Sequence, residues 1–257
     1  MSRLVEIARG IWAHASGALW LELIRTLVIA DAHLGYGWAM RRRGQLGPLR
    51  DEETIAKLRG TVEELTPSAT VFLGDLVHAP RPTPEEGELL QAVFEWLASR
   101  TRLILVEGNH DRGFRRDFGH VGFEICREWK RGEVCAIHGD RAELNLPAHH
   151  LIVGHFHPTL GLRDAAGALH RLPVFLHDSK ATVLPAFSPF AAGCDVREGV
   201  PEQMLSLFSS SEVAVFAVTG RQVKALGSTR LRCSGRASAA ARSSDNKEEG
   251  PQKRRLA

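Results

Sequence analysis

The first 160 residues alternate between short runs of consecutive apolar residues and longer segments in which apolar residues recur every three or four positions. The continuous runs have the length of strands that are buried on both faces. They are Thr26–Ala30, Val71–Leu73, Leu103–Val106, Val134–Ile137 and Leu151–Val153. The spaced pattern predicts amphipathic helices over Glu52–Leu65 and Glu85–Arg100. Strands that alternate with helices in this way predict an α/β fold with a partly parallel sheet.

The pattern differs at the N-terminus and after Pro158. Ile11–His14 and Ala18–Ile24 flank a Ser16-Gly17 turn, which indicates a hairpin. Beyond Pro158 the apolar runs are short and separated by turn residues, which predicts a second and more antiparallel sheet. These later strands are expected at Leu172–Leu176, Thr182–Leu184, Val213–Val218 and Gln222–Leu226.

Residues 228–257 have no apolar period and are rich in Ser, Ala, Arg, Lys and Glu. Such a segment buries too little surface to offset the entropy lost on ordering, so we expect one domain over residues 1–227 and a disordered, basic tail. The net charge of +3 is unevenly divided, because the tail carries eight basic and three acidic residues. Residues 1–227 carry 25 basic and 27 acidic residues, so the net charge alone does not indicate nucleic-acid binding.

The overall composition, 44% hydrophobic and 25% charged, is typical of a globular protein. The 257 residues contain no apolar run long enough to span a membrane, and the first residues lack the basic-then-apolar order of a secretory signal. The four cysteines have no paired CxxC spacing. These features predict a protein of the reducing cytoplasm that has no membrane partner.

Polar side chains follow each of the five buried strands, and the carboxyl ends of strands form the ligand sites of open α/β sheets. Seven of these side chains are candidate metal ligands: Asp31, His33, Asp75, Asn109, His138, His155 and His157. Oxygen and imidazole donors without a thiolate suit Mn²⁺, Fe or Zn²⁺. Seven ligands are natural for two ions about 3.5–4 Å apart that share a carboxylate. Asp75, alone after its strand, is the candidate bridge.

The order of these motifs resembles that of the calcineurin-like metallophosphoesterases over about residues 26–158. The motifs are Asp31-x-His33, Gly74-Asp75, Gly108-Asn109-His110-Asp111, His138-Gly139 and Gly154-His155-x-His157. The resemblance implies a four-layer αββα sandwich with two mixed β-sheets, and hydrolysis of a phosphoester. It implies that one ion is held by Asp31, His33, Asp75 and His157, and the other by Asp75, Asn109, His138 and His155. It also implies that a hydroxide bridging the ions attacks phosphorus and that His110 protonates the leaving oxygen.

A closer resemblance is to small bacterial and archaeal phosphoesterases related to double-strand-break repair nucleases, in particular the ligase-associated DNA damage response phosphoesterases. It is carried by Asp31-Ala32-His33-Leu34-Gly35, Arg41-Arg42-Arg43-Gly44, Leu172-Pro173-Val174-Phe175 and Leu184-Pro185-Ala186-Phe187-Ser188. This branch implies a DNA substrate, and a DNA ligase and a helicase as functional partners. Among the metals that suit the ligand set, Mn²⁺ is the one we expect, with Fe or Zn²⁺ as alternatives. The chain departs from the branch at Tyr36, where Lys is common, and at Ala191-Ala192-Gly193, where a Thr-Gly-Gly type sequence is common.

Several residues near these motifs have two interpretations. His78 is a candidate second acid/base or phosphate-orienting group, or a hydrogen-bonded loop histidine. Asp111 is expected either to orient His110 or to brace its loop. Four arginines are candidate contacts to substrate phosphates, with solvated surface as the alternative: Arg41, Arg42, Arg43 and Arg112.

The sequence therefore predicts a two-metal phosphoesterase that hydrolyses phosphodiester bonds, with DNA repair or processing as the expected role. One alternative is a phosphodiesterase that acts on a small molecule such as a nucleotide through the same site. The near-neutral domain favours this alternative, and salt-dependent DNA binding would separate the two. The other alternative is a non-enzymatic interaction module on the same fold. The presence of all seven candidate ligands and of His110 argues against it.

Overall fold

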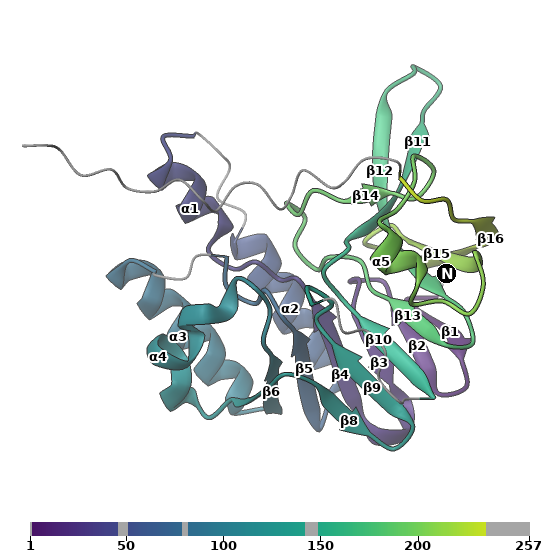
Figure 1. Ribbon diagram of the computed structural model, residues 1–257. Helices are drawn as coiled ribbons and strands as arrows, with labels where there is room; N and C mark the ends of the chain where they lie inside the picture. Colours follow the sequence, from purple (N-terminus) through teal and green to yellow (C-terminus); the bar gives the residue numbers. More distant parts are fainter. Residues whose placement is uncertain (1, 46–50, 79–81, 142–148, 235–257) are drawn as a thin grey trace, which may run out of the picture.

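The computed structural model describes residues 2–45, 51–78, 82–141 and 149–234. Its first sheet has seven strands in chain order, β1 to β7 (Figure 1). They are β1 Leu4–Ala8, β2 Ile11–His14, β3 Leu19–Leu21, β4 Thr26–Ala30, β5 Ala69–Leu73, β6 Arg102–Val106 and β7 Glu124–Cys126. Pairing is antiparallel from β1 to β4 and parallel from β4 to β7. The sheet is therefore mixed, with its parallel half formed by the strands that precede the predicted site residues.

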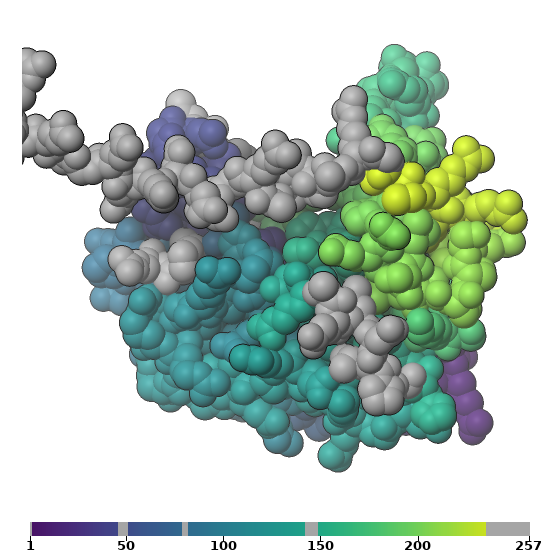
Figure 2. Space-filling view, in the orientation of Figure 1, coloured from purple at the N-terminus to yellow at the C-terminus, as the bar shows by residue number. Residues whose placement is uncertain are grey.

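The second sheet has nine strands and is also mixed. Its main path runs β14-β11-β12-β13-β10-β9-β8, and β15 pairs with both β12 and β16. The strands are β8 Trp129–Arg131, β9 Val134–Ile137, β10 His150–Val153, β11 Pro158–Arg163, β12 Leu169–His177, β13 Ala181–Val183, β14 Cys194–Asp195, β15 Glu212–Val218 and β16 Val223–Arg230. β10 is parallel to both β9 and β13. The β11–β12 hairpin projects from the body of the molecule (Figure 1, Figure 2).

Two long helices cover the outer face of the first sheet, α2 Asp51–Leu65 and α3 Pro84–Ala98. Thr83 and Glu86 form a capping box at the start of α3, and Pro84 takes the first helical turn, where its missing N–H has no cost. The shorter helices are α1 Tyr36–Arg42, α4 Phe114–Phe118 and α5 Glu202–Leu205, and the 3₁₀ helices are η1 Glu22–Ile24, η2 Asp111–Gly113 and η3 Gly119–Val121. Among the described residues, no helix is both long enough and apolar enough to cross a membrane.

Alternation of side chains along β4 explains how the layers stack. Leu27 and Ile29 pack with the apolar faces of α2 and α3, whereas Val28 and Ala30 pack with residues of the second sheet such as Ile152. The outer face of the second sheet packs against the segment that contains α5. The order of layers is therefore helices, sheet, sheet and a thin helical layer, which confirms the predicted sandwich with two mixed sheets (Figure 1).

The predicted buried strands and both predicted long helices are present, with ends that differ by one or two residues. The strands after Pro158 do not form a sheet of their own, because they join β9 and β10 in the second sheet. The predicted strand Ala18–Ile24 covers only Leu19–Leu21, since η1 and a left-handed Arg25 turn the chain. At the other end β16 continues through Arg230 and Leu231 is buried, so the described structure extends beyond residue 227. The remainder of the predicted tail, 235–257, lies outside the described residues.

Candidate metal centre

The carboxyl ends of strands from both sheets meet at one edge of the sandwich. β4, β5 and β6 of the first sheet lead into Asp31, Asp75 and Asn109, and β9 and β10 of the second sheet lead into His138 and His155. An open cavity of about 660 Å³ lies at this edge. Seven predicted site residues line it: His33, Asp75, His78, Asn109, His110, His155 and His157. The structure thus brings together side chains that are far apart in the sequence and that come from two different sheets.

The main chain of the site adopts conformations that few side chains tolerate. The described residues include seven non-glycine residues with positive φ, and five of these are predicted ligands. They are Asp31, His33, Asp75, His155 and His157, with φ between 44° and 67°. Asp and His enter the left-handed region more readily than most residues, and such outliers cluster at functional sites. The chain therefore turns sharply after β4, β5 and β10, and four of these five side chains line the cavity.

Gly74 allows two of these loops to approach each other closely. A Cβ atom at this position would lie 2.4 Å from Nδ1 of His138 and 2.8 Å from Cα of Gly108. Its φ of +70° is also one that side chains rarely adopt. The requirement for glycine directly before the predicted bridging residue Asp75 therefore has a steric cause.

Asp31, His33 and His157 form the first cluster of ligand atoms, all within 4.8 Å of one another. The main-chain N–H of His155 donates to Oδ2 of Asp31, which leaves Oδ1 directed at Nε2 of His157, 2.9 Å away. Nδ1 of His157 lies 3.4 Å from the carbonyl oxygen of Ala192, so that Nε2 carries the lone pair in the neutral ring. This cluster matches the set that the sequence resemblance assigns to one ion.

Asp75, His138 and His155 form the second cluster. Nδ1 of His138 donates to the carbonyl oxygen of Leu73 at 2.7 Å, which leaves Nε2 as the free nitrogen. That nitrogen lies 3.2 Å from Nδ1 of His155 and 3.3 Å from Oδ1 of Asn109. The residues assigned to the second ion are therefore adjacent.

Asp75, a member of the second cluster, also lies close to the first. The main-chain N–H of His110 donates to its Oδ1 at 2.9 Å. Its Oδ2 lies 3.6 Å from Nε2 of His138 in the second cluster and 3.9 Å from Nε2 of His33 in the first. This placement fits the predicted bridge.

Two observations indicate that the clusters are suited to cations. Oδ1 of Asp31 and Nε2 of His157 are buried, lie 2.9 Å apart and have no hydrogen-bond donor within the described part of the chain when His157 is neutral, which is costly unless a proton or a metal ion lies between them. Free nitrogens of His138 and His155 also face each other, an arrangement that repels unless a proton or a metal ion lies between them. The donors are carboxylate, amide and imidazole groups, which suit Mn²⁺, Fe or Zn²⁺.

The pKa values of Asp31 and His33 agree with this interpretation, whereas Asp31 outweighs burial and raises the pKa of His157, so that a metal ion competes with a proton at that ligand. Burial raises the pKa of Asp31, but the nearby His157, His138 and His33 outweigh it and lower the pKa to about 2. Burial lowers the pKa of His33 to about 3, against the opposing effect of Asp31. Asp31 is therefore ionised and His33 neutral at physiological pH, which are the protonation states that bind metal ions.

His110 and His78 are neighbours on the wall of the cavity. Nδ1 of His110 donates to the main-chain carbonyl of His78 at 2.9 Å, and the two rings stack with centroids 5.1 Å apart. Nε2 of His110 is then directed toward Oδ2 of Asp75, 4.0 Å away. His33, His78 and His110 together form a third group of close nitrogen atoms. His110 is thus oriented by a carbonyl group, with its other nitrogen facing the clusters.

Asp111 lies beneath the loops and does not line the cavity. Its carboxylate accepts hydrogen bonds from the main-chain N–H groups of Asp75, Leu76 and Gly108 at 2.7–3.0 Å. Burial and the charge of Asp75 raise its pKa to about 6, against the effect of these amides. Of the two roles expected for Asp111, the geometry corresponds to the brace of the loop and not to the orientation of His110.

The predicted arginines lie around the cavity and not on its wall. Arg42 pairs with the buried Glu86 at 2.7 Å, Arg41 lies over the ring of Trp38, and Arg43 is exposed at the end of α1. Arg42 and Arg43 are close enough to lower the pKa of His78, after the larger effects of burial and His110, to about 4.

Arg112 lines a second cavity of about 220 Å³ that shares Asn109 with the first. Arg141, which the sequence analysis did not single out, lies on the same second cavity.

Sequence reasoning missed two aromatic residues on the wall of the main cavity, Tyr36 and Phe190. The departure of Tyr36 from the pattern of the related phosphoesterases was the one available signal. No signal pointed to Phe190, whose contact with Tyr36 depends on how a distant loop folds.

Comparisons with known proteins agree with the fold. The sequence matches the family described as calcineurin-like phosphoesterase over residues 24–162, which is more than half of the chain. No curated protein sequence matches it.

Among solved structures, the Pseudomonas putida nuclease MPE is 24% identical to this chain, with a TM-score of 0.67. The match covers 87% of this chain and 98% of the nuclease chain. YfcE, a phosphoesterase from E. coli, is 13% identical with a TM-score of 0.40, covering 80% and 99%. The chain belongs to the calcineurin-like phosphoesterase family and is a hydrolase that acts on phosphoester bonds.

Proposed function

We propose that this protein hydrolyses phosphodiester bonds in DNA, in repair or processing, with two divalent metal ions at the cavity edge. The observation that carries the proposal is the pair of adjacent Asp/His clusters, with Asp75 of the second cluster close to His33 of the first. Asp31, His33 and His157 would hold one ion, and His138, His155 and Asn109 the other, with Asp75 shared. When bound, two such ions activate a water molecule and neutralise charge that develops on the phosphoryl oxygens.

His110 is the proposed general acid. Its Nδ1–H is held by the carbonyl of His78, so a protonated ring presents Nε2–H to the cavity. A leaving oxygen near that nitrogen receives the proton as its bond to phosphorus breaks. The side chain of His110 is 35% exposed, so a substrate can reach it. His78 holds the ring through its main chain and stacks on it.

DNA is favoured over a small diester by the surroundings of the site. Arg112 and Arg141 lie on the smaller cavity beyond Asn109, where a second phosphate of the same strand would meet them. Arg43 is exposed at the end of α1. The solved structure described above with a TM-score of 0.67 is named as a nuclease. Mn²⁺ is the proposed metal among the three that the carboxylate, amide and imidazole donors suit, with Fe and Zn²⁺ as alternatives. A DNA ligase and a helicase are the proposed functional partners, in the cytoplasm.

The test uses wild-type protein and His110→Ala, each stripped of metal and reloaded with Mn²⁺. Cleavage of bis-p-nitrophenyl phosphate is compared with cleavage of plasmid and single-stranded DNA. p-Nitrophenolate leaves readily without a proton, whereas a sugar hydroxyl does not. Loss of the general acid should therefore reduce DNA cleavage by about 10²–10⁴-fold and the aryl diester far less.

The controls are metal content, expected at two ions per chain in both proteins, and salt dependence of DNA binding. Turnover of the diester without any DNA cleavage by the wild type would favour the small-molecule phosphodiesterase. Absence of turnover with two bound Mn²⁺ ions would contradict the proposed activity.

A further inference from the structure

An aromatic wall borders the metal centre on the side of α1, and the proposed chemistry does not use it. It consists of Tyr36, the first residue of α1, and Phe190, in the loop that follows β13. Their rings are nearly parallel, with an interplanar angle of 8° and centroids 5.4 Å apart. Both side chains are half-buried and line the main cavity.

The wall is continuous with the catalytic histidines. The ring of Tyr36 meets that of His78 edge-on with centroids 4.7 Å apart, and His78 stacks on His110 at 5.1 Å. Tyr36 therefore lies two ring contacts away from the group that faces the leaving oxygen. In a nucleotide the sugar separates the phosphate from the base, much as His78 separates His110 from Tyr36. A phosphate at His110 would place its own base beside Tyr36.

The chemistry of the cavity assigns different tasks to its two parts. Carboxylates and imidazoles would surround the ions and the phosphate, so a flat apolar surface would contribute nothing there. Such a surface is suited to the face or edge of another planar ring. Proteins that bind single strands use aromatic side chains in this way, and the contact tolerates any base because every base has a π face. It also supplies binding free energy that the near-neutral domain does not obtain from charge.

We propose that the Tyr36–Phe190 wall contacts the nucleobase of the nucleotide at the scissile phosphate, and that it makes base-carrying diesters better substrates than diesters without a base. This inference rests on the proposed DNA cleavage. It assigns Tyr36 and Phe190 as specificity-determining residues and expects little preference among the four bases.

The test compares an oligothymidylate with an oligonucleotide of the same length made of abasic residues. Wild-type protein with Mn²⁺ should cleave the oligothymidylate with a kcat/KM about tenfold higher, in the range found for one stacked base. In Tyr36→Leu and Phe190→Leu this ratio should fall toward one, mainly through KM. Tyr36→Phe keeps the ring and should keep the ratio.

Trp96→Leu serves as the matched control, because Trp96 is a half-buried aromatic residue on α3 that does not line the cavity. It should keep the wild-type ratio. An unchanged ratio in both leucine variants would overturn the inference. This includes the case in which the activity on both substrates falls equally, because such a loss indicates a structural role. A wild type that cleaves neither oligonucleotide would instead contradict DNA cleavage itself.

Discussion

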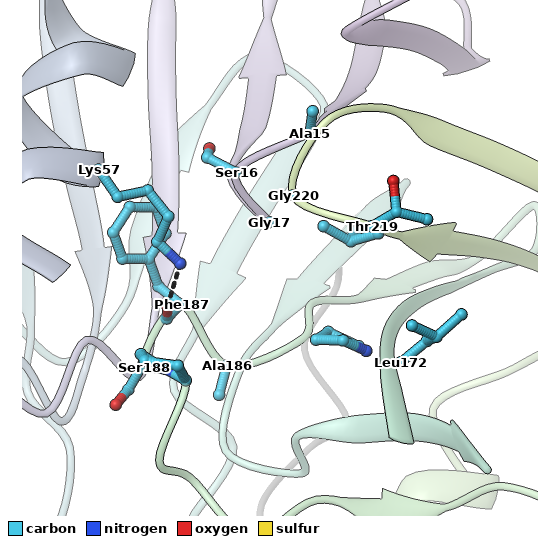
Figure 3. A pocket seen from close by; sticks show the side chains of 13 residues that line it. Ala15, Ser16, Gly17, Lys57, Leu172, Ala186, Phe187, Ser188, Thr219 and Gly220 are labelled. Carbon is cyan, nitrogen blue, oxygen red and sulfur yellow. Dashed lines mark hydrogen bonds between the residues drawn. The ribbon is translucent and has the colours of Figure 1, made fainter. Parts of the chain in front are cut away.

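The ammonium group of Lys57 contacts Phe187 twice, since Nζ donates to its main-chain carbonyl and lies 3.9 Å from the centroid of its ring (Figure 3). Phe187 in turn donates its N–H to the carbonyl of Ala30, and Ser188 donates to the carbonyl of Asp31. A lysine of α2 therefore secures the segment that holds the main chain of a candidate metal ligand. The same segment lines a separate pocket of about 240 Å³ between two hairpin turns, at Gly17 and Gly220 (Figure 3).

Substitution Lys57→Met should weaken this brace, because methionine fills the space but neither donates a hydrogen bond nor carries charge. We expect a loss of about 1–2 kcal/mol in the free energy of unfolding and several-fold weaker Mn²⁺ binding. Urea denaturation and metal titration measure the two effects. Lys224→Met, at an exposed position of β16, is the control. Equal behaviour of the two variants would show that the Lys57–Phe187 contact does not support the site.

Asp111→Asn should destabilise the loop that carries Asp75. The carboxylate of Asp111 accepts four main-chain hydrogen bonds, and an amide nitrogen in place of either oxygen cannot accept those that this oxygen now accepts. We expect a loss of about 1–3 kcal/mol and a reduced content of bound Mn²⁺, measured by denaturation and by elemental analysis. Asp117→Asn removes an ion pair with Arg116 and should cost less than about 1 kcal/mol. A variant Asp111→Asn with wild-type stability would contradict this role.

Gly74→Ala should be much more damaging than Gly220→Ala. Both glycines have positive φ, +70° and +78°, but only at Gly74 would a Cβ atom collide, with His138 and Gly108. In both variants the alanine is held in an unfavourable backbone conformation, which costs about 1 kcal/mol of stability. At position 74 the collision costs about 1–3 kcal/mol more. Thermal and urea denaturation give the difference between the two variants. Similar losses would mean that the loops around Gly74 can move apart freely.

His150 and His177 should make the protein sensitive to acid. Both rings lie against the hydroxyl of Thr182, at 2.8 and 2.9 Å, and that hydroxyl has one proton to give. Burial and His150 lower the pKa of His177 from 6.5 to about 4. Between these values the unfolded chain binds a proton that the folded chain does not, so stability rises with pH and is lost as pH falls from 6.5 to 4.

His177→Gln removes this titration. We expect the wild type to lose about 1–2 kcal/mol more than the variant over that range, less than the full shift because the ring is only partly buried. Denaturation curves at several pH values measure the difference. Parallel curves for the two proteins would exclude His177 as the source.

The strands next to the site could be predicted because each is buried on both faces and therefore apolar throughout. Thr26–Ala30 faces the helices on one side and the second sheet on the other, and its sequence reflects both. The sequence of a buried strand does not indicate which sheet it joins. The prediction therefore did not assign β9 and β10 to a different sheet from β4, β5 and β6. Helix α1 was missed because it is short and starts at a left-handed Gly35 without a side-chain cap.

The candidate ligands were identified from their type and their position after strands, and the structure places them together. The roles of Asp111 and Arg42 could not be predicted, because they depend on partners that are remote in the sequence. Asp111 bonds to amides near residue 75, and Arg42 pairs with Glu86. The contact of Tyr36 with Phe190 depends on the same kind of long-range closure.

Each candidate ligand cluster draws residues from both sheets, with Asp31 and His33 opposite His157, and Asp75 opposite His138 and His155. An ion in either cluster would act as a cross-link between the two halves of the chain. Binding that requires the assembled sandwich stabilises it in proportion to the logarithm of metal concentration. Neither half of the chain, produced alone, would contain a complete cluster, and metal affinity therefore reports whether the two sheets have docked.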